Sequence, residues 1–148
     1  MQGGQRDLRV ARQVGQVQDP AAARRDQLQQ PRARIAQTRG VGVQCSGGDV
    51  QSGLQAVEGV GDVVSGYAGG TTLNPTYDLV NTETTGHAET VLVYYNPQVI
   101  SYKELVNVFF SSHDPTTKDQ QGPDRGNSYR SVLFYQTDAE KDIAMSVI

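Results

Sequence analysis

The spacing of hydrophobic residues changes from a helical to a strand period soon after residue 50. Within residues 50–58, the apolar side chains of Val50, Leu54 and Val57 recur at helical spacing, which predicts an amphipathic helix. The valine-rich residues 60–68 follow and predict a strand. A helix packed beside a strand therefore begins the folded part of the chain.

Residues 87–95 alternate and predict a second strand. One face of this strand would carry Glu89, Val91, Val93 and Tyr95, and the other Ala88, Thr90, Leu92 and Tyr94. Ser101 and Glu104 have the spacing of a capping box, so we expect a helix over residues 102–112 that presents its Leu, Val and Phe side chains to a core.

The C-terminal third combines a long polar loop with a last strand and helix. Residues 114–128 are polar and rich in Pro and Gly, whereas residues 129–136 predict a strand. Thr137 and Glu140 form a second capping box that opens a final helix. The order of elements, with one strand added before the first helix, predicts an α+β fold. It would be a two-layer sandwich with helices on one face of a mixed sheet, a split β-α-β unit with a ferredoxin-like core.

Composition divides the chain near residue 48. All seven tyrosines and all three phenylalanines lie at Tyr67 or later, and residues 1–48 carry eight arginines and three aspartates. Without aromatic residues this segment buries too little apolar surface to offset its ordering entropy. We therefore expect residues 1–48 to be a disordered or aberrant Arg/Gln-rich segment and residues 49–148 to form the domain. No convincing first strand is predicted in the N-terminal segment.

Composition also narrows the function classes. No apolar run approaches the roughly 20 residues that span a bilayer, and no signal-peptide pattern follows Met1. We therefore expect a soluble, cytoplasmic protein without a membrane partner. We also expect a monomer. Cys45 is the only cysteine, which excludes an intramolecular disulfide. The arginines could bind nucleic acid, but interleaved aromatic residues are missing, and we rank that interpretation last.

The stretch from Gly66 to Glu89 is dense in glycine, hydroxyl and turn residues and is the best candidate for a site. Glu89 begins a strand, where burial would raise its pKa and make it a proton donor; the alternative is an ordinary strand-end carboxylate. Tyr77 ends an Asn-Pro-Thr-Tyr turn, and Asp124 and Tyr129 flank a glycine-bearing turn. The histidines lack metal-ligand spacing with the cysteine, so no metal site is expected.

Taken together, these motifs resemble one known family. GYAGG, NPTY, TGHAE, YNPQVISYKELVNVFF and HDPTTKDQQGPDRGNSYRS occur in one order at unbroken spacing. Residues 50–148 thereby resemble the A-type peptide methionine sulfoxide reductase family. The resemblance implies thiol-dependent reduction of the S-epimer of methionine sulfoxide, free or in oxidised proteins, with no bound cofactor and with thioredoxin or another thiol as reductant.

The resemblance also implies roles for individual residues. Glu89 would be the acid, Tyr77 and Tyr129 the phenols that bind the sulfoxide oxygen, and Asp124 a residue that orders the site. Tyr67 and His87 would lie at the substrate-binding positions. In the family, a cysteine thiolate attacks the sulfoxide sulfur and becomes a sulfenic acid, which a thiol then reduces.

This sequence departs from the family at the nucleophile. The family carries Gly-Cys-Phe-Trp before the first helix, and ungapped counting places Cys45, Ser46, Gly47 and Gly48 there. Cys45 would serve only if the register slipped by one residue, and a serine at position 46 cannot cycle through a sulfenic acid. The family's C-terminal segment is also expected to be absent. The alternative function is therefore a catalytically dead scaffold that binds oxidised methionine peptides without turnover.

Overall fold

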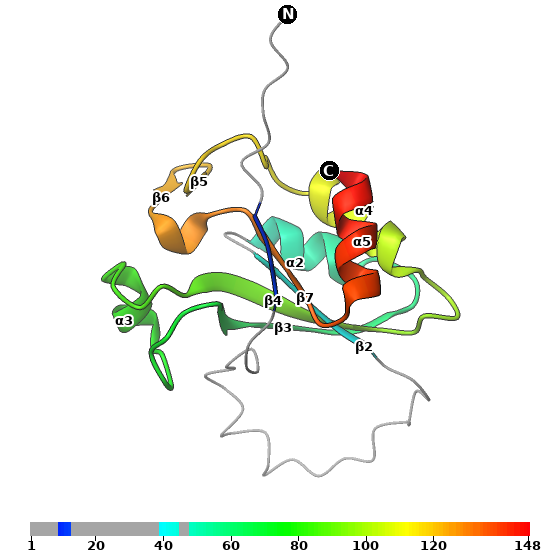
Figure 1. Cartoon of the computed structure of the whole chain (residues 1–148), viewed down its shortest axis with the longest axis horizontal. Helices are drawn as coiled ribbons and strands as arrows, with labels where there is room; N and C mark the ends of the chain where they lie inside the picture. The colour runs from blue at the N-terminus through cyan, green and yellow to red at the C-terminus, as the bar shows by residue number, and fades with distance from the viewer. Residues whose placement is uncertain (1–8, 13–38, 45–47) are drawn as a thin grey trace, which may run out of the picture.

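Alternating strands and capped helices assemble into a mixed sheet with helices on one face. The computed structural model describes residues 9–12, 39–44 and 48–148, with side chains from Val50 onward. In Figure 1, helices α2, α4 and α5 lie together on one side of the sheet, and α3 lies at the far end of the β3–β4 pair. The predicted α+β sandwich with helices on one face is confirmed.

The five-stranded sheet has the order β1-β7-β2-β4-β3. Strand β2 is antiparallel to both β4 and β7, β3 is antiparallel to β4, and β1 is parallel to β7. Strand β4 therefore lies between β2 and β3, the two strands that helix α2 connects, which is the split β-α-β arrangement. The strands are Arg9–Arg12 (β1), Arg39–Gln44 (β2), Val60–Ala68 (β3), Ala88–Tyr95 (β4) and Val132–Tyr135 (β7).

The first strand comes from a segment that we expected to lie outside the fold. Arg39–Gln44 forms the centre of the sheet and Arg9–Arg12 its edge, so the expectation of disorder is wrong for these two stretches. The strand at residues 39–44 contains two glycines, which weaken any sequence signal for a strand, whereas its two neighbours supply a hydrogen-bonded ladder on each side. The other residues before position 48 lie outside the described part of the chain.

The helices begin where the capping residues predict. Ser101 accepts from the Glu104 backbone N–H at 3.2 Å while the Glu104 carboxylate accepts from the Ser101 N–H at 2.8 Å. Thr137 and Glu140 form the same reciprocal pair at the last helix. The helices are Gly48–Gln55 (α2), Tyr77–Asn81 (α3), Tyr102–Ser111 (α4) and Asp138–Val147 (α5). Helix α2 thus begins and ends earlier than the predicted 50–58.

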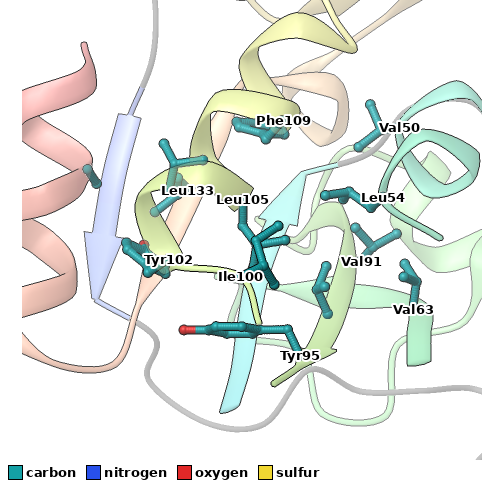
Figure 2. Close-up of a cluster of buried hydrophobic side chains, with 13 residues drawn as sticks. Val50, Leu54, Val63, Val91, Tyr95, Ile100, Tyr102, Leu105, Phe109 and Leu133 are labelled. Carbon is teal, nitrogen blue, oxygen red and sulfur yellow. The ribbon is translucent and has the colours of Figure 1, made fainter. Parts of the chain in front are cut away.

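The core lies between these helices and the sheet. Phe109 and Leu105 from α4 pack with Leu54 from α2 against Val91 and Leu133 of the sheet, as Figure 2 shows. These side chains are almost completely buried, so their removal from water is the main stabilising contribution. A smaller cluster covers the opposite face of the sheet and contains Ala68, Ala88, Val132 and Phe134.

Two local predictions differ from the structure. The Asn-Pro-Thr-Tyr turn continues into helix α3, because Thr76 caps it by accepting from the Leu79 N–H at 3.3 Å. The long polar loop contains a small hairpin and a 3₁₀ turn, so the last strand begins at Val132 and Tyr129 precedes it. The elements in this loop are Gln120–Gln121 (β5), Asp124–Arg125 (β6) and Asn127–Tyr129 (η1). Within the described ranges, every helix is too short or too polar to cross a membrane.

Candidate active site

The pairing of β3 with β4 brings the first two candidate residues together. Tyr67 and Glu89 are directly opposite each other in this antiparallel pair. Directly opposite residues project from the same face of a sheet. The Tyr67 side chain is only 8% exposed, and Glu89 is partly buried. A carboxyl group and a phenol thus share a largely desolvated position at the end of the hairpin.

His87 ties the two chain segments that leave this pair. Its Nδ1 atom accepts from the Gly70 backbone N–H at 3.1 Å, and its Nε2 atom lies 2.8 Å from the Thr72 carbonyl oxygen. An acceptor at Nδ1 assigns the proton of the neutral imidazole to Nε2, which donates to Thr72. Both ring nitrogens contact backbone atoms, so His87 links the segment before β4 to the segment after β3. Its role in substrate binding stays a prediction.

Gly70 lies where the two loops approach most closely. A Cβ atom at this position would lie 2.4 Å from both the His87 backbone nitrogen and the Thr85 carbonyl oxygen. The Thr71 N–H donates to the same carbonyl at 3.1 Å, which continues the pairing beyond the strands. Gly70, the last residue of GYAGG, is therefore required by the close approach of the two backbone segments.

Tyr77 reaches the site from the first turn of α3. This side chain is 60% exposed, in contrast to Tyr67. Its position depends on the Thr76 cap and on Val80, which is buried and anchors the short helix. The hydroxyl of Tyr77 therefore belongs to the solvent-facing rim of the site.

The 3₁₀ turn η1 carries Tyr129, and two side-chain contacts fasten this turn to the loop before β4. The Glu83 carboxylate accepts from the Ser128 hydroxyl at 2.6 Å and from the Ser128 N–H at 3.0 Å. The Arg130 guanidinium donates to the Gly86 carbonyl oxygen at 2.9 Å. Tyr129 lies between these two contacts in the sequence.

Asp124 lies in the small β5–β6 hairpin just before this turn. The hairpin pairs Gln121 with Asp124, and the Gly126 N–H donates to the Asp119 carbonyl oxygen at 2.9 Å. Asp124 is exposed, yet its charge acts on Glu89. Asp124 therefore lies close enough to the candidate acid to act on its charge.

The electrostatics of these groups favour protonated forms. Burial raises the pKa of Glu89 above its ordinary value, and the carboxylates of Asp124 and Glu83 raise it further. Burial, then the charge of Glu89, raises the pKa of Tyr129 to about 12. Burial and Glu89 also raise the pKa of Tyr67. Such a cluster can donate hydrogen bonds and a proton to a polar oxygen.

The site residues predicted from the sequence are brought together where the structure describes them. Glu89, Tyr67, Tyr77, Asp124 and Tyr129 act on one another electrostatically. Cys45 and Ser46 lie outside the described residues, so the structure does not test either as a nucleophile. Sequence reasoning missed Glu83, Ser128 and Arg130. Arg130 had one available signal, its place directly after Tyr129, whereas Glu83 lies in a polar loop without any periodic pattern.

The chain matches a known protein family over most of the part that the structure describes. The family model described as peptide methionine sulfoxide reductase matches residues 47–148. A peptide methionine sulfoxide reductase from Methanosarcina mazei is 47% identical over 97 residues, covering 66% of this chain and 46% of the relative. One from Methanococcoides burtonii is 48% identical over 96 residues, covering 65% and 63%. The chain thus spans about half to two thirds of the length of these relatives.

Solved structures agree with the sequence relatives. Methionine sulfoxide reductase A of Corynebacterium diphtheriae aligns with a TM-score of 0.66 at 30% identity, covering 76% of this chain and 57% of that one. The reduced form of Mxr1 from Saccharomyces cerevisiae aligns with a TM-score of 0.68 at 33% identity, covering 77% and 68%.

We predict that the Glu89→Gln variant is more stable than the wild type at neutral pH. The pKa of Glu89 is raised on folding, so ionisation opposes folding once the pH passes the ordinary value of 4.5. The difference in the free energy of unfolding should therefore grow with pH until Glu89 is ionised in the folded state. It should disappear below pH 4. Urea denaturation across this pH range measures it.

The matched control for this pH series is Glu104→Gln. Hydrogen bonds from Ser101 lower the pKa of Glu104, so its ionised form stabilises the fold and that contribution is lost as the pH falls. The control should be less stable than the wild type at neutral pH. A Glu89→Gln variant with the same sign as Glu104→Gln would contradict the assignment of Glu89 as a desolvated acid.

We predict opposite effects for alanine at two glycines. Gly70→Ala should destabilise the fold by about 1–3 kcal/mol, because the new methyl group would overlap backbone atoms. Gly53→Ala should stabilise it by about 0.5–1 kcal/mol, because the site lies within α2 and the nearest atom is the Ser112 Cβ at 3.7 Å. Denaturant titration of both variants measures the two shifts. Equal effects would refute the close loop contact.

Proposed function

Because the chain belongs to the peptide methionine sulfoxide reductase family, we propose that it binds methionine sulfoxide and reduces it to methionine. The observation that carries the proposal is the partly buried Glu89, which pairs with Tyr67 across the two strands and whose charge acts on Tyr129. A sulfoxide needs a proton at its oxygen before the sulfur–oxygen bond can break. A carboxyl group whose pKa is raised by burial and by neighbouring carboxylates, beside phenols that donate hydrogen bonds, supplies that requirement.

Each residue of the cluster has a distinct role in this proposal. Glu89 donates the proton to the sulfoxide oxygen. Tyr129 and Tyr77 donate hydrogen bonds to the same oxygen, one from a partly buried turn and one from the exposed rim. Asp124 keeps the proton on Glu89 through its negative charge. Tyr67 supports Glu89 from the facing strand.

The reduction itself requires a thiol. A thiolate attacks the sulfoxide sulfur and forms a sulfur–sulfur bond while Glu89 protonates the oxygen. The hydroxyl is then transferred to the thiol sulfur, the sulfur–oxygen and sulfur–sulfur bonds break, methionine leaves, and the thiol becomes a sulfenic acid. A dithiol such as thioredoxin then reduces the sulfenic acid, releasing water and forming its own disulfide. The sulfoxide gains two electrons, which the dithiol provides.

Cys45 is the thiol that we propose for this step. The backbone register supports the choice, because Gln44 at the end of β2 pairs with Thr90, the residue after Glu89. Cys45 follows Gln44 directly in the sequence, and α2 begins at Gly48. A thiol close to the N-terminus of a helix is more easily ionised.

The substrate that we propose is the S-epimer of methionine sulfoxide, either free or within an oxidised protein.

The second candidate function is binding without turnover. Ungapped alignment places Ser46 at the family's nucleophile, and a serine hydroxyl does not form the sulfenic intermediate. Glu89 and the tyrosines would still hold the sulfoxide oxygen. The chain would then be a scaffold that recognises oxidised methionine and releases it unchanged.

The assay that tests the proposal uses the purified chain with methionine S-sulfoxide, first with dithiothreitol and then with thioredoxin and its reductase. We expect methionine to form, and we expect Cys45→Ser to abolish turnover while Ser46→Ala retains it. Glu89→Gln should lower kcat by about 10²–10⁴-fold, the range for loss of a general acid. Methionine and dithiol disulfide are both quantified.

Two outcomes would change the assignment. Full activity in Cys45→Ser would remove Cys45 from the mechanism. No turnover by a folded wild-type chain would reject reductase activity. Binding of the sulfoxide by that inactive chain, measured by calorimetry, would then support the scaffold function.

A further inference from the structure

We propose that Glu83 is a positioning residue for Tyr129: its carboxylate holds the turn η1 against the loop before β4 and so fixes the phenol beside Glu89. The two carboxylate oxygens accept separately from the Ser128 hydroxyl at 2.6 Å and the Ser128 N–H at 3.0 Å. These partners are 45 residues apart in the sequence. The description of Tyr129 as an oxygen-binding group rests on the proposed function, whereas the contact itself does not.

The backbone at Glu83 is adjusted to make this contact. Glu83 has φ of 60°, in the left-handed region, and its N–H donates to the Val80 carbonyl oxygen at 3.0 Å as α3 ends. Glycine is the residue that favours this conformation, and a larger side chain adopts it only at a steric cost. The two charge-assisted hydrogen bonds to Ser128 offset that cost. The side chain at this position therefore does more than end the helix.

The opposite side of the contact is shaped to receive the carboxylate. Ser128 is 1% exposed, so its hydroxyl and N–H would be costly to leave without acceptors. Gly126 has φ of 137°, and a Cβ atom there would lie 2.5 Å from the Glu83 carboxylate oxygen. Gly126 thus leaves the space through which Glu83 reaches the turn.

A second contact holds the other side of Tyr129. Arg130 donates to the Asn127 carbonyl oxygen at 2.7 Å within the turn and to the Gly86 carbonyl oxygen at 2.9 Å in the loop before β4. The residues on both sides of Tyr129 are therefore fastened to one short loop, at Glu83 and Gly86. Rotation of the turn would have to break both contacts, so loss of the Glu83 contact should loosen Tyr129 without unfolding the domain.

Glu83 also contributes charge to the site. Its carboxylate is the smallest of the causes that raise the pKa of Tyr129, after burial and the charges of Glu89, Asp124 and Tyr77. It likewise adds to the raised pKa of Glu89, after burial and Asp124. Because Glu83 is exposed, solvent screens this effect. Its positioning role is therefore the larger one.

The test compares Glu83→Gln, Glu83→Gly and Ser128→Ala by NMR on the full chain. Glu83→Gly relieves the left-handed backbone but removes both hydrogen bonds, so the Ser128 amide should exchange with solvent at least about fivefold faster and the Tyr129 ring signals should shift. Glu83→Gln keeps the shape but removes the charge, so the pKa of Glu89 should fall while Tyr129 keeps its signals. Ser128→Ala should shift Tyr129 and leave the pKa of Glu89 unchanged.

The matched control is Asp78→Asn on α3. Asp78 acts on Tyr67 and not on Glu89, so this variant should leave the pKa of Glu89 and the Tyr129 signals unchanged. Unchanged Ser128 exchange and Tyr129 signals in Glu83→Gly would overturn the proposal. These readouts need no turnover. A chain that shows them but fails the reductase assay would keep the positioning role and lose the proposed function.

Discussion

The site depends on the register between β3 and β4. Pairing Tyr67 with Glu89 places a carboxyl group and a phenol on one face at the end of a hairpin. A shift of one residue would turn Glu89 to the opposite face. His87 extends this register beyond the strands by joining Gly70 and Thr72 to the β4 side. The other candidate residues, Tyr77, Asp124 and Tyr129, come from segments outside this strand pair.

The surrounding charges raise the pKa of Glu89 further and favour its protonated form. Burial alone raises the pKa of Glu89, so its ionised form destabilises the folded state. The charges of Asp124 and Glu83 raise this pKa, and the cost in stability, further. The chain retains this arrangement although hydrogen bonds around the site, from Glu83 to Ser128 and from Arg130 to Gly86, are needed to hold it together. The raised pKa of Glu89 lowers the stability of the fold, and the surrounding hydrogen bonds hold the site in place despite that cost.

Much of the scaffold could be predicted because its signals are local. Capping boxes at Ser101 and Thr137 marked two helix starts, valine content marked β3, and alternation marked β4. Strand β2 could not be predicted, because its glycines carry little strand preference and its neighbours in the sheet decide its conformation. The candidate site residues after position 50 could be predicted because they lie in short sequence motifs. Glu83 was missed because its partner, Ser128, is distant in the sequence.

The central claim is that Glu89, Tyr77 and Tyr129 form a binding site for a sulfoxide oxygen. The most direct measurement is an NMR titration of the isotopically labelled chain with N-acetyl methionine S-sulfoxide, followed by the R-epimer and by N-acetyl methionine. The account predicts saturable shifts at these three residues with the S-epimer, weaker shifts with the R-epimer, and none with methionine. Equal shifts with all three ligands, or no shift at Glu89, would contradict it.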